Sequence, residues 1–379
     1  MEAKLTPRRL NRATLERQLL LRREALDPVE AVRRLVALQA QEPASVYLAL
    51  WTRLADFEPA DLDAGLADQR LLKATLMRIT LHVLHADDYP ALHEAMQPML
   101  RAARLNDGRF RAAGLSVEEY EALVPQVIEF ASSPRTNAEV EAWLDERLGE
   151  LPKPSVWWAM RHVAPFVHAP TGGPWSFGQR PSFRAAPRLQ RSGDWEAAMR
   201  VLVRRYLAGF GPATLDDVAQ FGMFYRTLLR PVIDGMADEL VRLAGPGRGD
   251  LLDLPGAPLP GEDTPAPPRL LPMWDSVLLA YADRARIIPA EYRKLVTRSN
   301  GDVLPTLLVD GYVAGVWRPV EEGIEATAFR RLPHEAWTGL DAEARMLRDF
   351  LAPREPMVYR RYARWWVDLP AAEVRVLGQ

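Results

Sequence analysis

The chain has 379 residues, of which 48% are hydrophobic and 26% are charged, and its formal net charge is −2. This composition is typical of a globular protein with room for two or three compact modules, and it excludes disordered, fibrous and polycationic classes. The sequence contains no cysteine, which also excludes disulfides, thiolate nucleophiles, iron–sulfur clusters and cysteine-type zinc sites.

The histidine spacing and the lengths of the apolar runs also bear on whether the protein binds a metal or a membrane. None of the six histidines has the spacing of a metal-binding motif, so a metal site is not expected. No stretch approaches the roughly 20 apolar residues that span a bilayer, and the basic N-terminus lacks the apolar core of a signal peptide. We expect a cytoplasmic protein with no membrane contact. Only four of the 48 basic residues are lysines; arginine suits phosphate contact, but a GC-rich genome explains this bias more simply.

Regular structure is first expected between Thr6 and about Leu84. Asp27 followed by Pro28 is typical of a helix N-terminus. Apolar and polar residues alternate over 78–83, which predicts a half-buried strand. Apolar residues at helical spacing predict helices over residues 10–21, 28–38, 46–54 and 59–67.

Two glutamines, Gln39 and Gln41, flank one alanine where the second of these helices must end. In a continuous helix, residues two apart point about 200° from one another, so the two amides would face opposite ways. Pro43 disfavours the helical conformation at Glu42, so the chain is expected to become extended near Gln41. Both amides can then reach one side. Taken alone, such a pair is more often a solvated helix end than a site.

Two later segments repeat an order of helix, turn, helix and hairpin. In the first, Thr136 and Glu139 have the spacing of a capping box. In the second, a turn at 209–212 precedes a helix that starts at Thr214. The predicted elements are helices over 136–148 and 154–163, a hairpin over 166–177, and helices over 195–207, 214–222 and 225–243. Helices followed by a wing-like hairpin are typical of a winged helix-turn-helix, and three in tandem favour a surface for DNA.

The remainder of the chain is more mixed. Glycine and proline are frequent over 245–268, which predicts a loop or mobile wing. The Asp310-Gly311 turn predicts a hairpin over 303–317, and a helix is expected over 341–351. Arginine and aromatic residues crowd the segment 359–366, which is either a phosphate-binding tail or a docking segment.

Several spaced segments together make a more specific pattern than any one motif. They cover residues 38–41, 75–82, 211–219, 270–286 and the end of the last hairpin at 315–318. In this order they resemble the AlkZ-type winged-helix DNA glycosylases, and the resemblance covers nearly the whole chain.

The resemblance implies an α+β, mainly helical fold of three tandem winged helix-turn-helix motifs with added β-hairpins, in one C-shaped body that wraps duplex DNA. It implies no metal and no organic cofactor, and we expect a monomer. The expected division is a first winged-helix unit with the glutamines over 1–130, a second over 131–190, a third over 191–268, and a β-rich C-terminal segment with a closing helix over 269–379.

The resemblance also implies an activity, the hydrolysis of the N-glycosidic bond of N7-alkylated purines, including those held in interstrand crosslinks. Gln39 and Gln41 match the family's catalytic Gln-apolar-Gln motif. A narrow role in self-resistance against a crosslinking natural product such as an azinomycin and a broad role in repair both stay open. The Gln-apolar-Gln form favours the narrower role by analogy.

Other residues are expected to contact DNA. The family's Arg-Gly-Thr-x-His motif appears here with Ile79 in place of glycine, a departure that bears on close approach of DNA at this turn. For Asp275, a role in holding a turn is an open alternative. For Arg284 and Arg286, the open alternative is an ion pair with Asp283 or Glu291. The expected DNA-binding residues are Arg78, Thr80, His82, Asp275, Ser276, Arg284 and Arg286.

Neutral amides suit the implied reaction. An N7-alkylated guanine is cationic and leaves as a neutral base, so it needs little help from a strong acid. A glutamine is no base near neutral pH, but it can hold a water by accepting and donating hydrogen bonds, and its carbonyl dipole favours a cationic sugar.

The scarcity of lysine predicts a monofunctional glycosylase that leaves an abasic site, because cleavage of the backbone uses an amine. Lys73 lies near the first hairpin and is interpreted as a solvated wing residue. The alternative function is a non-enzymatic winged-helix transcriptional regulator, which reads base edges with a recognition helix.

Overall fold

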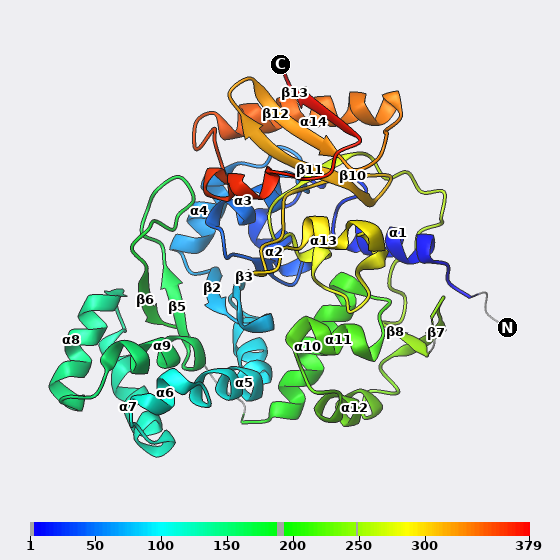
Figure 1. Ribbon diagram of the computed structural model, residues 1–379. Coiled ribbons are helices and arrows are strands. Elements are labelled where there is room, and N and C mark those ends of the chain that lie inside the picture. The colour runs from blue at the N-terminus through cyan, green and yellow to red at the C-terminus, as the bar shows by residue number, and fades with distance from the viewer. Residues whose placement is uncertain (1–3, 188–192, 248) are drawn as a thin grey trace.

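Two main β-sheets, a separate hairpin and the helices around them give the chain an α+β fold (Figure 1). The computed structural model describes residues 4–187, 193–247 and 249–379. Its α-helices are α1 Pro7–Arg17, α2 Pro28–Arg34, α3 Pro43–Trp51, α4 Pro59–Ala67, α5 Tyr89–Leu105, α6 Gly108–Ala112, α7 Val117–Phe130, α8 Asn137–Leu148, α9 Lys153–Val163, α10 Trp195–Phe210, α11 Leu215–Gly222, α12 Arg226–Asp234, α13 Arg293–Val296 and α14 His334–Leu351. Short 3-10 turns are η1 Met77–Ile79, η2 Ser276–Leu278, η3 Arg284–Arg286, η4 Ala290–Tyr292 and η5 Arg360–Trp366.

The larger sheet has the strand order β1-β3-β2-β5-β6-β4 and the second has the order β13-β12-β11-β10-β9. Within the larger sheet, a single residue pair, Lys73 with His168, joins β2 to β5. The strands are β1 Leu38–Gln39, β2 Leu71–Thr75, β3 Leu81–His85, β4 Arg135–Thr136, β5 Phe166–Ala169, β6 Ser182–Ala185, β7 Val241–Ala244, β8 Asp250–Asp253, β9 Arg269–Leu271, β10 Thr306–Val309, β11 Tyr312–Val320, β12 Gly323–Ala328 and β13 Glu373–Leu377.

The helix starts follow from local sequence. Asp27 caps α2 by accepting hydrogen bonds from the main-chain N–H groups of the first turn, with Pro28 at the first helical position. Complete capping boxes open α8 at Thr136 and α11 at Thr214. The predicted caps at Asp27 and Thr136 and the predicted helix start at Thr214 are confirmed.

The first difference from the expected elements lies at the glutamines. Helix α2 ends at Arg34 rather than near residue 38, and Val36 adopts the left-handed region with φ 73°. Leu38–Gln39 is a two-residue strand, in which Leu38 pairs with Val83 and Gln39 with His82. The chain therefore becomes extended before Gln41, because it joins the edge of a sheet.

Other differences also come from pairing across the chain. Helix α12 stops at Asp234, ahead of Gly235, rather than at 243. Residues 241–244 form strand β7, which pairs with β8, and β8 lies inside the segment 245–268 that was expected to be a loop. Strand β6 starts at Ser182, beyond the hairpin expected to end at 177. Helix α14 starts at His334, earlier than 341.

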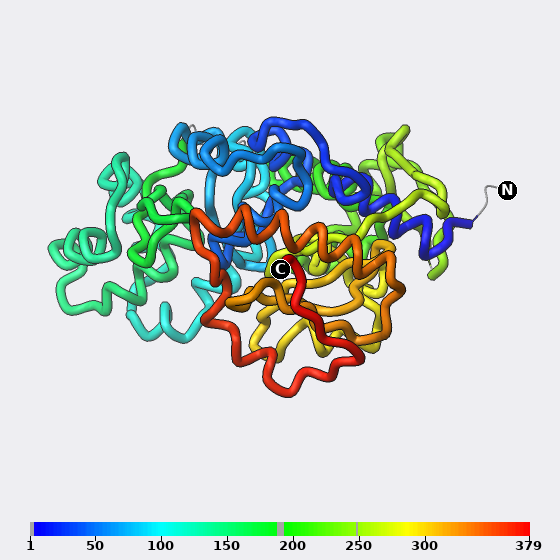
Figure 2. Tube along the Cα trace, turned by 90° about the horizontal axis from the view of Figure 1, so that it is seen from above, coloured from blue at the N-terminus to red at the C-terminus, as the bar shows by residue number. Residues whose placement is uncertain are grey.

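The arrangement in space places the glutamine segment centrally. Figures 1 and 2 agree that helices α6 to α9 and the β7–β8 hairpin lie at opposite ends of the molecule, with β1 to β3 between them.

Trp157 and Trp317 are among the largest fully buried side chains. Among the described helices, none has both the length and the apolar character that crossing a bilayer requires.

Candidate active site

Gln39 and Gln41 lie at the edge of the larger sheet, on either side of the end of β1. Gln39 is the last residue of β1, and its side chain is buried. Gln41 is exposed in the connection to α3, which begins at Pro43. The sheet edge and the helix start thus hold the two residues in fixed places.

Neighbouring donors determine how both amides are oriented. The Arg78 guanidinium donates a hydrogen bond to Gln39 Oε1 at 2.7 Å, and the Leu81 main-chain N–H donates one to Gln41 Oε1 at 2.9 Å. Since guanidinium and peptide N–H groups only donate, the atoms that they contact must be the amide oxygens. No described residue accepts a hydrogen bond from either amide nitrogen. Both NH₂ groups are therefore available to a ligand or a water.

Arg78 sits at the centre of this arrangement. The same guanidinium lies 3.2 Å from His82 Nε2, donates to the Phe221 carbonyl at 3.3 Å and lies 5.7 Å from the Phe221 ring centroid. Burial, with the nearby charge of Arg284, lowers the pKa of Arg78 to about 10. It is still protonated near neutral pH, and it connects the β2–β3 turn to α11. As placed, Arg78 positions Gln39 from inside the protein.

His82 is buried and neutral in this structure, and its expected contact with DNA stays a prediction. Its Nδ1 lies 3.0 Å from the Thr80 carbonyl, so this nitrogen carries the proton and donates. Nε2 is then the acceptor for Arg78. Burial and the Arg78 charge lower the pKa of His82 to about 3. Its side chain is 1% exposed and serves the interior of the site.

The turn that carries Arg78 has an unusual backbone. Arg78 and Ile79 have φ of 53° and 57°, the left-handed region. A β-branched residue is strained there, whereas glycine is not. Ile79 thus adopts a glycine-like conformation at the position where the resembled motif has glycine.

Asp275 and Ser276 are also inside the protein, and their expected contact with DNA stays a prediction. The Asp275 carboxylate accepts two hydrogen bonds of 2.8 Å from the buried Arg53 guanidinium and caps η2. Ser276 Oγ donates to the Ala37 carbonyl at 3.1 Å. Asp275 thus holds a turn, and Ser276 ties η2 to the residue before β1.

Thr80, Arg284 and Arg286 are half-buried. Thr80 Oγ1 donates to the Met77 carbonyl at 3.1 Å. Arg284 donates to Thr297 Oγ1 at 3.1 Å, and Arg286 donates to the Pro212 carbonyl at 2.7 Å. Within the described residues neither arginine forms an ion pair. The structure therefore gathers Gln39, Gln41, Arg78, Thr80, His82 and Arg284 around one turn.

A cleft of about 550 Å³ opens beside Gln41. Its wall includes Lys73, which is only 5% exposed and lies under the Phe177 ring. The interpretation of Lys73 as a solvated wing residue is therefore wrong. Its position between Leu72 and Ala74 in an apolar run could have indicated burial. The burial of Arg53 has no comparable signal, because its partner Asp275 is 222 residues away.

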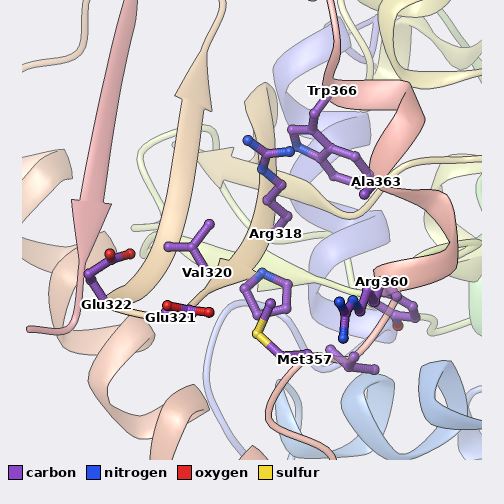
Figure 3. Close-up of a pocket in the computed structure, with 11 residues that line it drawn as sticks. Arg318, Val320, Glu321, Glu322, Met357, Arg360, Ala363 and Trp366 are labelled. Carbon is purple, nitrogen blue, oxygen red and sulfur yellow. The ribbon is translucent and has the colours of Figure 1, made fainter.

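A second pocket, of about 400 Å³, lies on the far side of Tyr359 and Arg360. Figure 3 shows Arg318, Val320, Met357 and Trp366 around it, with Arg360 at its edge. No group of three or more acidic or histidine residues that could hold a metal ion occurs in the described parts of the chain. Of the two glutamines, Gln41 lines the first cleft, and Gln39 precedes it by two residues at the end of β1.

Comparisons with known proteins point to one family. A family model described as DNA glycosylase AlkZ-like matches residues 32–350. An interstrand DNA cross-link repair glycosylase from Streptomyces sahachiroi is 27% identical over 350 residues, covering 85% of this chain and 91% of the relative. The solved structure of the Streptomyces sahachiroi DNA glycosylase AlkZ matches with a TM-score of 0.77 at 23% identity, covering 93% of this chain and 99% of that one. The matched span contains every candidate site residue.

Proposed function

The chain belongs to the AlkZ-like family of DNA glycosylases, and from this premise we propose that Gln39 and Gln41 carry out its reaction on N7-alkylated purines. A DNA glycosylase hydrolyses the N-glycosidic bond between a base and its sugar. The family assignment favours this enzyme over a transcriptional regulator.

The observation that carries the assignment is the fixed orientation of both amides. Arg78 and the Leu81 N–H hold the two carbonyl oxygens from one turn, so the glutamines are ordered before substrate arrives. Such preorganisation lowers the entropic part of the reaction barrier. Each held oxygen keeps a second lone pair, and each NH₂ group keeps its donors. The pair can therefore place a water against an electron-poor C1′ as the neutral base leaves.

The open cleft beside Gln41 supports action on bulky and crosslinked lesions. A crosslinked base stays tethered to the opposite strand and cannot swing fully out of the duplex, so a closed base pocket does not suit it. The cross-link repair activity in the name of the 27% identical relative agrees with this substrate. Self-resistance against an azinomycin-type agent is the narrower form of the proposal.

We propose three winged helices as the framework. In the first two segments a helix, a short strand, two helices and a hairpin follow one another, and the first strand pairs with the last. The third segment has the same order, with the isolated bridge between Ala213 and Leu252 in place of that strand pair. The segments are 28–85, 117–185 and 195–253, followed by the β-rich segment 269–377. Because α7 is the first helix of the second segment, its boundary is better placed before 117 than at 130. The expected boundary at 190/191 lies outside the described residues.

Duplex DNA would lie along a C-shaped body formed by these units, with Thr80, Arg284 and Arg286 near the lesion. We propose that the protein acts as a monomer in the cytoplasm, without a cofactor, and leaves an abasic site.

Base release decides this proposal. The double variant Gln39→Ala/Gln41→Ala should release no base from N7-alkylguanine duplex or from a crosslinked duplex, yet bind both. The exposed Gln126→Ala is a matched control and should behave as the parent protein. Undiminished release by the double variant would sink the glutamine assignment. A parent protein inactive on both substrates would contradict the proposed substrate class.

A further inference from the structure

Lys73 is a buried cation without a hydrogen-bonding partner in the described structure. It comes from β2, its side chain is 5% exposed, and its Nζ lies 4.1 Å from the Phe177 ring centroid. No described residue forms an ion pair or hydrogen bond with Nζ. The side chain lines the same cleft as Gln41, so its ammonium group faces the space beside the candidate active site.

The acidic groups of the cleft are already engaged. Glu42, next to Gln41, pairs with Arg361 at 2.5 Å and contacts the Tyr362 hydroxyl at 3.3 Å. Glu355 accepts a hydrogen bond of 2.5 Å from the Trp175 indole. Lys73 therefore keeps a charge that these carboxylates do not directly neutralise.

Burial has a measurable effect on this amine. It lowers the pKa of Lys73 to about 8, although the Glu42 charge opposes the change. The other charged or titratable groups of the cleft are His168 of β5, whose pKa burial holds well below its usual value, Tyr359, whose pKa burial raises well above its usual value, and the arginines Arg360 and Arg361 of η5. An unpaired ammonium in such a place is stabilised by an anion that enters the cleft.

A second unpaired cation lies in the same cleft. Arg360 is exposed and lines the cleft wall, and its guanidinium contacts no partner among the described residues. Arg360 also lines the neighbouring pocket, as Figure 3 shows. Arginine and lysine together bind one phosphate by a planar fork and a point charge.

We propose that Lys73 and Arg360 form a subsite for a phosphodiester of the lesion-bearing DNA strand. Bound there, the backbone holds the damaged nucleotide beside Gln41. The inference rests on the proposed function, because DNA is the substrate that brings a phosphate to this cleft. Lys73 is a positioning residue in this scheme and forms no covalent bond.

Affinity measurements test the subsite. Lys73→Met should bind alkylated duplex about tenfold more weakly than the parent protein. The slope of log affinity against log salt should shrink by about 0.9. Lys73→Arg should restore both, and the exposed Lys294→Met should change neither. Thermal melts establish that each variant is folded. Parent-like affinity of a folded Lys73→Met would overturn the proposal.

Duplexes in which one phosphate at a time is replaced by an uncharged methylphosphonate identify the phosphate that contacts Lys73. A methylphosphonate at the phosphate that fills the subsite should weaken binding of the parent protein, but should not weaken Lys73→Met further. Arg360→Met should show the same loss of sensitivity at the same phosphate. If every methylphosphonate position weakens the parent and Lys73→Met equally, the subsite does not exist.

The pH dependence of affinity provides an independent reading. A neutral amine does not attract phosphate, so affinity of the parent protein should fall between pH 7 and 9, and Lys73→Arg should not show this fall. The same fall in both proteins would contradict the inference. So would borohydride trapping of an abasic duplex on Lys73, since the amine would then act as a nucleophile. Base release, measured separately, tests the proposed function whatever these affinities show.

Discussion

At the scale of single residues, the candidate site depends on donors that hold the glutamines. Arg78 serves both Gln39 and His82, whose acceptor atoms lie 2.7 Å and 3.2 Å from the same guanidinium nitrogen. Removing this side chain leaves two buried acceptors without their donor. The arginine therefore controls orientation in the site more than any other single residue near it.

Arg78→Met should lower the rate of base release about a hundredfold, because a displaced Gln39 no longer meets the reacting atoms in the required geometry. Affinity for alkylated duplex should change much less. Single-turnover release and equilibrium binding measure the two effects, and the exposed Arg331→Met is the control. An unchanged single-turnover rate would show that the Gln39 orientation does not depend on Arg78.

His82 should make stability depend on pH. In the unfolded chain its pKa is near 6.5, whereas burial lowers it to about 3 in the fold. Between these values the unfolded chain binds more protons, so stability is lost as pH falls below about 6.5. From pH 6.5 to 5 the loss is about 2 kcal/mol.

Urea unfolding at several pH values tests this contribution. The decrease in unfolding free energy should be smaller in His82→Gln than in the parent protein. Other buried histidines titrate in both proteins and cancel in the difference. Equal decreases would mean that His82 is not a buried neutral base.

At the scale of elements, the β2–β3 turn stores strain at Ile79. Left-handed backbone costs a non-glycine residue about 1–2 kcal/mol. Ile79 also packs against the core, so the backbone effect is best isolated by comparing two small replacements at this position.

Ile79→Gly should be more stable than Ile79→Ala by about 1 kcal/mol, because glycine accepts the positive φ. At Leu81, in the regular strand β3, the same pair of replacements should show the opposite order. Denaturant midpoints of the four variants measure both differences. Glycine less stable than alanine at both positions would argue against the left-handed turn.

Local sequence predicts the elements whose cause is local. The caps at Asp27 and Thr136, the helix start at Thr214 and the turn at Asp310 are confirmed, because each depends on residues a few positions apart. The same holds for α4, expected over 59–67 and found there.

Long-range pairing explains what the sequence does not predict. Strand β1 has only two residues and forms because it pairs with β3. Strands β7 and β8 likewise form by pairing with each other. In the site, the Gln-Ala-Gln pattern was visible, but the burial of Lys73 and the Arg53 partner of Asp275 depend on segments far along the chain.

At the scale of the whole molecule, segments far apart in the sequence contribute to the same sheet and the same hydrophobic core. The larger sheet runs from β3 through β2 into β5, by the Lys73 and His168 pair. Arg78 connects the β2–β3 turn to the Phe221 carbonyl of α11, and α5 packs along α10.

Thermal unfolding should therefore be one cooperative transition. The melting curves followed by far-ultraviolet circular dichroism and by tryptophan fluorescence should coincide, since the chain has 11 tryptophans spread along its length. Two separate transitions would show that the units unfold independently despite their shared sheet.

The hydrogen bond from the Leu81 N–H to Gln41 Oε1 bears on which residues could replace Gln41. A carboxylate keeps the held oxygen and exchanges only the outward NH₂ for a second oxygen. A change from Gln41 to glutamate thus keeps the anchoring contact and reverses the hydrogen-bonding character of the group that faces the cleft. The difference between a neutral and an acidic group at position 41 is then a single atom, whereas the main-chain anchor from Leu81 is common to both.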